Sequence, residues 1–287
     1  MTPLGILAIV GLVLTLSSAW RHRPRRRRAQ LQMSASVASW AVLWFSTGSS
    51  FARQGMMNLP DHMIGHVLVM FLVPMGLRVG ATARTWAWLV PVARRRSLLR
   101  WWYVDRTLRV PRWLASPIPA VIAMNAVMVC AHLPSVFNYA MEHDLAMNWV
   151  MEPAFLLSGC YFFHFLLPSW PRRVTVKIRL QLAMVLVSML EMLIMAMSMS
   201  IFTKSSWYSV YQMSSMPSMP YMPGMGLSPI VAFHQQQLAA AILWICGDFW
   251  AVPCLVLIVR RIIVRDGSLL AALDRQSPRS SVESPVA

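Results

Sequence analysis

The chain has 287 residues, of which 57% are hydrophobic and 13% are charged, and its mean hydropathy is +0.53. This composition excludes a soluble domain of this size and indicates a helical membrane protein. The formal net charge of +16 does not indicate nucleic-acid binding, because the basic residues stand in short clusters between apolar runs, as they do in cytoplasmic loops.

The predicted fold is all-α, with seven transmembrane helices. The segments that qualify by length and apolar content are 3–19, 33–51, 59–79, 118–133, 148–167, 178–202 and 230–259. The basic run "RHRPRRRR" after the first segment predicts a cytoplasmic end there, which places the N-terminus outside and the C-terminus in the cytoplasm. Only Arg53 and Lys204 then fall in outside loops. We expect a membrane domain over 1–265, an outside Met/Pro-rich loop over 204–228 and a disordered cytoplasmic tail over 266–287.

The long inner loop interleaves arginines with tryptophans between the third and fourth spans. Its tryptophans are Trp86, Trp88, Trp101, Trp102 and Trp113. We interpret it as interfacial helices on the anionic lipid of the inner leaflet, with the aromatic rings at headgroup level. A docking surface for a partner protein is the alternative.

Two histidines open the third span in "LPDHMIGHVLVM". His62 and His66 are four residues apart, so both rings project from one face of the helix, with Met70 one turn deeper. Imidazole binds copper, zinc and iron, whereas a thioether selects cuprous copper. Ionisable side chains in a span indicate function, so we predict a metal site here. The alternative is a pair of interfacial histidines wetted by headgroups.

The outer loop before the seventh span carries a methionine at every third position in "MSSMPSMPYMPGM". The repeated residues are Met213, Met216, Met219, Met222 and Met225. The intervening prolines favour polyproline II, which has three residues per turn and would align the five thioethers along one edge. We predict that this edge captures Cu(I) loosely; an incidental, flexible loop is the alternative.

Other candidate ligands and acids lie near the outer face or inside the spans. The further candidate metal ligands are His132, His143 and His234. The possible buried acids are Glu152, Glu191 and Asp248. A carboxylate within a span is costly, so Glu191 and Asp248 each either line an ion path or make an interhelical hydrogen bond, whereas Glu152 lies near the outer face.

Three stretches together resemble the CtaG-type cytochrome c oxidase assembly factors, linked to caa-type oxidases. They are "LPDHMIGHVLVMFLVPMGLRVG", "CAHLPSVFNYAMEHD" and "LSPIVAFHQQQLAAAILW". The family's H-M-x-x-H motif corresponds to His62 and His66. Its W-H-x-P-x-x-x-x-A stretch corresponds to His132, Pro134 and Ala140, with Ala131 in place of the tryptophan. Its S-P and Q-Q-L-A elements correspond to 228–229 and 236–239.

The chain departs from the family pattern at the fifth span. Where members usually carry L-H-x-x-E-H, this chain keeps Glu152 but has Asn148 and Pro153 in place of the histidines. Gln235 stands where the family has an acid, and His234 is an addition. The metal site is therefore either rebuilt around His143, His234 and the methionine tract, or lost.

The resemblance implies a non-enzymatic assembly factor in the bacterial cytoplasmic membrane. We expect it to capture Cu(I) transiently at the outer face and to deliver it to subunits of a terminal cytochrome c oxidase, with other copper chaperones as further partners. A copper permease and a haem-binding electron-transfer protein are the alternatives. No nucleophile motif accompanies the histidines, so hydrolase chemistry has no support.

Overall fold

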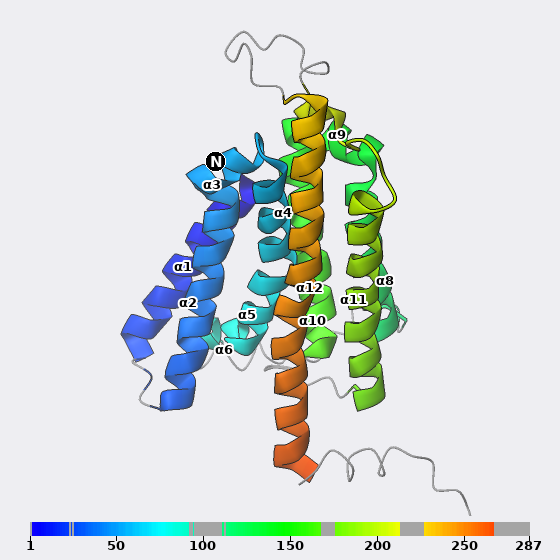
Figure 1. The fold of residues 1–287 in the computed structure, drawn as a ribbon. Coiled ribbons are helices and arrows are strands. Elements are labelled where there is room, and N and C mark those ends of the chain that lie inside the picture. The colour runs from blue at the N-terminus through cyan, green and yellow to red at the C-terminus, as the bar shows by residue number, and fades with distance from the viewer. Residues whose placement is uncertain are drawn as a thin grey trace, which may run out of the picture.

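The fold is a bundle of long helices, seen here in a computed structural model that describes residues 2–22, 24, 26–91, 94, 111, 113–167, 176–212 and 227–266 (Figure 1). Within these ranges the chain is all-helical apart from one isolated bridge, between Gln212 and Leu227. The methionine tract, the middle of the long inner loop and the tail fall outside the described residues.

The first half of the chain forms two long helices and a broken third. These are α1 (Pro3–His22), α2 (Arg27–Gly48), the short α3 (Ser50–Gly55), α4 (Leu59–Val67), a π-helical turn η1 (Leu68–Leu72), α5 (Val73–Val79) and α6 (Thr82–Ala87). The second half contains α8 (Pro117–His132), α9 (Pro134–Glu142), a second π-helical turn η2 (Ala146–Met151), α10 (Glu152–Leu166), α11 (Ile178–Ser200), the 3-10 turn η3 (Ser209–Tyr211) and α12 (Pro229–Asp266).

Prolines mark the beginning of many of these helices. Proline stands in the first turn of α1, α4, α8, α9, α10 and α12, where its missing N–H costs nothing and its fixed φ suits the helix. The opposite end of α10 is held by Arg78, whose guanidinium donates to the carbonyls of His164 and Leu167 at 3.4 and 3.3 Å. Otherwise unpaired carbonyls at the helix end are thereby satisfied.

Each of the seven predicted segments is helical, but fewer qualify as membrane spans by length and apolar content. Within the described residues four do: 3–21, 59–79, 178–200 and 229–264. The pair α8 and α9, bent by 73° at Leu133, passes the same test only when its two helices are taken together, as a broken span or a re-entrant loop. The chain is therefore a membrane protein with several apolar spanning helices.

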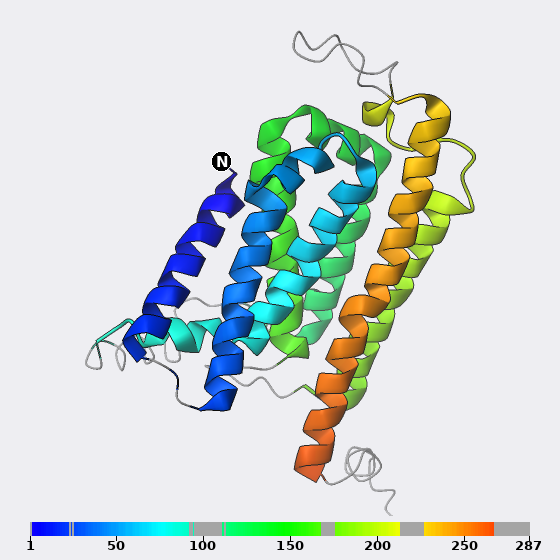
Figure 2. The same cartoon turned by 60° about the vertical axis from the view of Figure 1, so that its left-hand side comes forward.

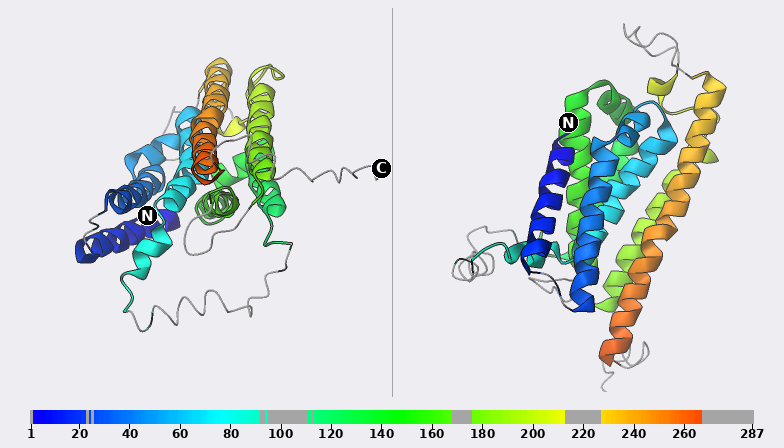
Figure 3. Two further views of the ribbon diagram at one scale, coloured as in Figure 1. Left: turned by 90° about the horizontal axis from the view of Figure 1, so that it is seen from below. Right: turned by 90° about the vertical axis from the view of Figure 1, so that its left-hand side faces the viewer.

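The helices place the loops at two opposite ends of the bundle. The N-terminus, α3, α9 and the first turns of α12 lie at one end, and α6 with the first turns of α2 and α11 lies at the other (Figures 1 and 2). We call these the upper and lower ends. α12 runs beside α11 for much of its length, and α1 and α2 form the opposite side of the bundle (Figure 3).

The core lies between α4–α5, α10 and α12 and is rich in phenylalanine and methionine. Phe71 stacks on Trp250 with ring centroids 4.9 Å apart, and Phe162 and Phe163 meet the same indole edge-on. The Gly159 position on α10 lets two backbones approach closely, because a Cβ there would lie 2.0 Å from the Met70 carbonyl oxygen. α10 therefore packs directly against η1, just below the histidine-bearing turns of α4.

One expectation for the inner loop needs correction. The Trp86 ring stacks on Trp40 at 5.5 Å, and its Nε1–H donates to Thr15 Oγ1 at 3.0 Å. Trp86 is thus anchored between α1 and α2 and does not lie free at headgroup level, because Thr15 offers its indole a partner inside the bundle. Trp88 and Trp113 are exposed, whereas Trp101 and Trp102 lie outside the described residues.

Candidate functional site

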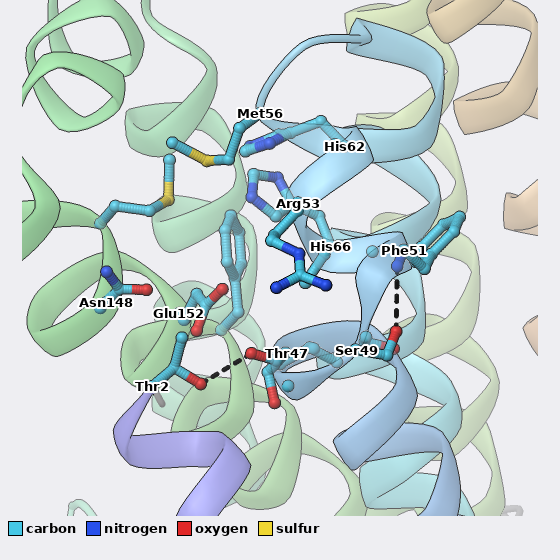
Figure 4. Close-up of a pocket in the computed structure, with 18 of the residues that line it drawn as sticks. Thr2, Thr47, Ser49, Phe51, Arg53, Met56, His62, His66, Asn148 and Glu152 are labelled. Atoms are coloured by element: carbon cyan, nitrogen blue, oxygen red, sulfur yellow. Dashed lines mark hydrogen bonds between the residues drawn. The ribbon is translucent and has the colours of Figure 1, made fainter. Parts of the chain in front are cut away.

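A pocket of about 450 Å³ opens at the upper end of the bundle. Its walls come from the end of α2, from α3, from the first turns of α4 and from the stretch that joins η2 to α10. Figure 4 shows His62 and His66 on one side of this pocket, Asn148 and Glu152 on the other, and Arg53 reaching over it from α3. Segments far apart in the sequence thus meet at one opening.

His62 and His66 form the buried wall of the pocket. Their ring centroids are 4.2 Å apart, and only 8% and 6% of the two residues is exposed. His62 makes a main-chain hydrogen bond with Gly55, but its Nε2 and both ring nitrogens of His66 have no hydrogen-bond partner among the described residues. A buried polar atom without a partner costs about 1–3 kcal/mol, so these nitrogens are unusual unless a ligand or water meets them.

The turn that carries these histidines is fixed from both sides. The Asn58 amide donates to Asp61 at 2.9 Å in the first turn of α4. The N–H of Leu59 is held by the Gln235 side chain of α12 at 3.4 Å. These contacts fix the first turn of α4, from which both imidazoles project.

His132, at the end of α8, lies beside the same cluster. Its ring centroid is 5.8 Å from that of His66, and 1% of the residue is exposed. Its Nδ1 lies 2.7 Å from the Met128 carbonyl, which only accepts hydrogen bonds, so Nδ1 carries the proton and Nε2 presents its lone pair. That lone pair faces the Met63 sulfur at 3.1 Å. Two electron-pair donors therefore point at one another with no proton between them.

Met63 is the ligand candidate that the sequence reasoning missed. It follows His62 directly, about 100° around the helix from it, and so lies off the stripe formed by His62 and His66. Only the tertiary fold, which brings the end of α8 beside α4, places its sulfur next to His132. The signal available in the sequence was the H-M pair itself, a thioether adjacent to a predicted imidazole ligand.

Aromatic rings and a tyrosine hydroxyl enclose the histidine cluster. Phe137 of α9 lies 5.1 Å from the His62 ring, and Phe155 of α10 lies 4.3 Å from the His66 ring. Tyr208, fully buried before η3, donates to the His132 carbonyl at 3.2 Å. Burial raises the pKa of the Tyr208 hydroxyl above its ordinary value, which keeps this donor protonated.

The three acids predicted to be buried are placed differently. Glu152 lines the pocket, and its Oε2 is buried without a hydrogen-bond partner in the part of the chain that the structure describes. Glu191 lies on α11, and its Oε1 is also buried and unpartnered. Asp248 is exposed, so its predicted burial is wrong: it shares the outward face of α12 with Ile245 and Phe249, which are 65% and 74% exposed.

The other sequence candidates do not join the cluster. His143 is exposed, stacks on Tyr139 at 4.1 Å and has its Nδ1 2.8 Å from the Tyr139 carbonyl. His234 is exposed near the start of α12. Neither lines the pocket. The methionine tract 213–225 lies outside the described residues.

The donor set suits a soft ion better than a hard one. Among the described residues, no three His, Cys, Asp or Glu side chains are arranged to hold one ion, so a site made of those types alone is not formed there. The neighbouring donors are instead imidazoles and one thioether: His62, His66, His132 and Met63. Thioether and imidazole together select cuprous copper.

The comparisons with known proteins agree with the resemblance carried by the sequence motifs. The family model described as cytochrome c oxidase caa3 assembly factor (Caa3_CtaG) matches residues 13–265. The searches of curated proteins and of solved structures gave no match. The family match begins halfway along α1 and reaches almost to the end of α12, so it includes both pocket histidines and His132. The chain therefore belongs to the family of cytochrome c oxidase caa3 assembly factors.

Proposed function

We propose that this chain is a non-catalytic assembly factor that receives cuprous copper at the outer face of the bacterial cytoplasmic membrane and delivers it to a terminal cytochrome c oxidase. One observation supports this most strongly. The buried nitrogens of His62 and His66 have no partner at the wall of an open pocket, beside the His132–Met63 contact. Family membership supplies the oxidase as the client.

The proposed topology has seven spans, the N-terminus outside and the C-terminus in the cytoplasm. The upper end is then the outer face, which carries the pocket and, by prediction, the methionine loop.

The two spans that composition alone does not support are α2 and η2–α10. In α2 the hydroxyls of Ser39, Ser46 and Thr47 donate to carbonyls four residues earlier, at 2.7–2.8 Å. Hydroxyls satisfied inside the helix allow a serine-rich segment to lie in the bilayer.

The charge distribution also supports this orientation. Basic residues of the described chain gather on the elements at the lower end: Arg27, Arg28, Arg78, Arg84, Lys177, Arg179, Arg260 and Arg261. Cytoplasmic ends of spans carry such an excess. Exposed Trp88 and Trp113 belong to the same end, where they would meet the anionic headgroups of the inner leaflet.

The pocket can hold Cu(I) without forming a cage. His62 Nε2 and one ring nitrogen of His66 offer lone pairs at the pocket wall, and the His132–Met63 pair adds one more nitrogen and a sulfur. The surrounding Phe137 and Phe155 rings limit water at the buried side. Few ligands and an open mouth favour transient binding, which delivery requires. The methionine tract would supply the pocket by loose capture, alone or from other copper chaperones.

A permease receives less support from the structure. Its path would use Glu191 and Asp248, but Asp248 lies on the outward face of α12. The two acids therefore do not line one common route. Whole-cell copper content separates the two functions, because a permease variant changes it and an assembly-factor variant does not.

The test is the copper-to-haem ratio of terminal oxidase purified from a strain that lacks this protein. The strain is complemented with the wild type, with His62→Ala/His66→Ala, or with His143→Ala, an exposed histidine outside the pocket. We expect a copper deficit with haem intact, corrected by the wild type and by His143→Ala but not by the double variant. Normal copper in the oxidase of the deletion strain would refute delivery.

A further inference from the structure

A second pocket, also of about 450 Å³, lies between α8 and α11. Its lining includes His132, Glu191 and Met195, and its remaining walls are almost entirely apolar. Leu190 and Ile194, on the same face of α11, are each 56% exposed. In a membrane protein such exposed apolar side chains face lipid, so this pocket opens sideways into the bilayer and not to water.

His132 connects the two pockets. Its ring lies next to His66, which lines the outer pocket, and its Nε2 faces Met63. The same residue lines the lateral pocket. One imidazole at the end of α8 therefore stands between an opening that faces water and an opening that faces lipid.

The lateral pocket carries its own donors for a soft cation. The lining on α11 runs from Ser198 down to Val187, a length of about 16 Å at 1.5 Å per residue. Met195 offers a thioether along this stripe, and one turn deeper Glu191 has a buried oxygen without a partner. An ionisable side chain without a partner at membrane depth is expensive and marks a path or a site.

Resting on the proposed function, we infer that the cuprous ion leaves the protein sideways through this lateral pocket, towards a nitrogen or sulfur ligand on a membrane-embedded helix of the client. The step is a ligand exchange with no change of oxidation state. A bond from copper to His132 breaks as a bond to the Met195 sulfur or a Glu191 oxygen forms. The ion replaces the proton of the Glu191 carboxyl, which is released to water, and the resulting carboxylate balances the single positive charge, so the ion does not cross the apolar pocket as an uncompensated charge.

The alternative exit is the way the ion entered, back through the outer pocket to water. The two exits differ in which environment the accepting ligand occupies. Chelators of Cu(I) that differ in charge therefore distinguish them: bathocuproine disulfonate stays in water, whereas uncharged neocuproine also enters the bilayer.

The experiment uses the full chain in lipid vesicles, loaded with Cu(I) alone, and follows the rate at which each chelator extracts the metal. The test variant is Glu191→Gln/Met195→Leu. The control is Glu142→Gln/Met189→Leu, which makes the same changes outside the lateral pocket. We expect the test variant to slow extraction by neocuproine by about tenfold, the size of loss usual for support around a metal site. Extraction by the disulfonate should match that of the control.

Equal rates of extraction by neocuproine in the test and control variants would overturn the lateral exit. The same conclusion would follow if the test variant slowed extraction by both chelators equally. A second variant, Ile194→Trp, narrows the lipid-facing mouth and removes no donor, and it must slow neocuproine in the same way. A failure of the proposed function would give a different result. The wild type and His62→Ala/His66→Ala would then hold the same amount of copper before any chelator is added.

Discussion

Gly65 offers a way to close the outer pocket without disturbing the fold. It lies on α4 between the two pocket histidines and lines the pocket. A Cβ built on Gly65 meets no atom within 4 Å. Side chains placed at this position therefore enter the empty volume of the pocket and displace no neighbour.

The expected effects separate folding from binding. Gly65→Ala should raise the free energy of unfolding by about 0.8 kcal/mol, because alanine is the better helix former and no contact opposes it. Cu(I) affinity should stay within about twofold of the wild type, a free-energy difference below 0.5 kcal/mol. Gly65→Leu extends into the 450 Å³ pocket beside His62 and His66. It should weaken Cu(I) binding at least tenfold, about 1.4 kcal/mol.

The assay is competition for Cu(I) against bathocuproine disulfonate with purified protein in detergent, with thermal unfolding of the same samples. Unchanged affinity in Gly65→Leu would refute a metal site at this pocket wall. A loss of stability in Gly65→Ala would refute the open space beside α4.

Three further predictions concern contacts around the site. Gly159→Ala should destabilise the protein by about 1–3 kcal/mol in thermal unfolding, because the added Cβ would meet the backbone carbonyl of Met70, which cannot move aside. Unchanged stability would contradict the close packing of α10 against η1. Asn148→His should tighten Cu(I) binding in competition titrations, because Asn148 lines the outer pocket. The control Val150→His, at a residue that is 66% exposed, should leave Cu(I) affinity unchanged. Equal gains in affinity from the two variants would contradict a metal site in this pocket. Tyr208→Phe should cost about 1 kcal/mol by losing the hydrogen bond to His132. Because burial raises the pKa of Tyr208, wild-type stability should fall as pH rises above about 10, where tyrosine in the unfolded chain ionises, and the fall should be shallower in Tyr208→Phe.

The helices were largely predictable because their boundaries depend on local chemistry. The segment predicted at 59–79 is helical over the same residues, and the one predicted at 178–202 ends two residues earlier. Apolar length and prolines at the first turn fix such limits without reference to the rest of the fold. The family resemblance was predictable for the same reason, since its motifs are short and continuous in the sequence.

The site was predictable only in part, because its remaining members depend on packing. His62 and His66 share a face of one helix, so their spacing already places them together. The Met63–His132 contact requires the end of α8 to lie beside α4, and no local pattern carries that information. The exposure of Asp248 was not predictable for a related reason: the residues of α12 around it are apolar on every side, so the sequence does not show which face turns outward.

The π-helical turn at Leu68–Leu72 makes the direction of the pocket histidines sensitive to chain length. Because each residue of an α-helix turns the chain by about 100°, one residue fewer in this turn would rotate His62 and His66 by about that angle relative to α5. Both rings would then leave the pocket while every residue of the site remained in the sequence. Among relatives, an alignment gap at this turn would thus predict loss of the site more reliably than a substitution nearby. Insertions and deletions here are therefore the changes to look for in relatives that keep the H-M-x-x-H motif.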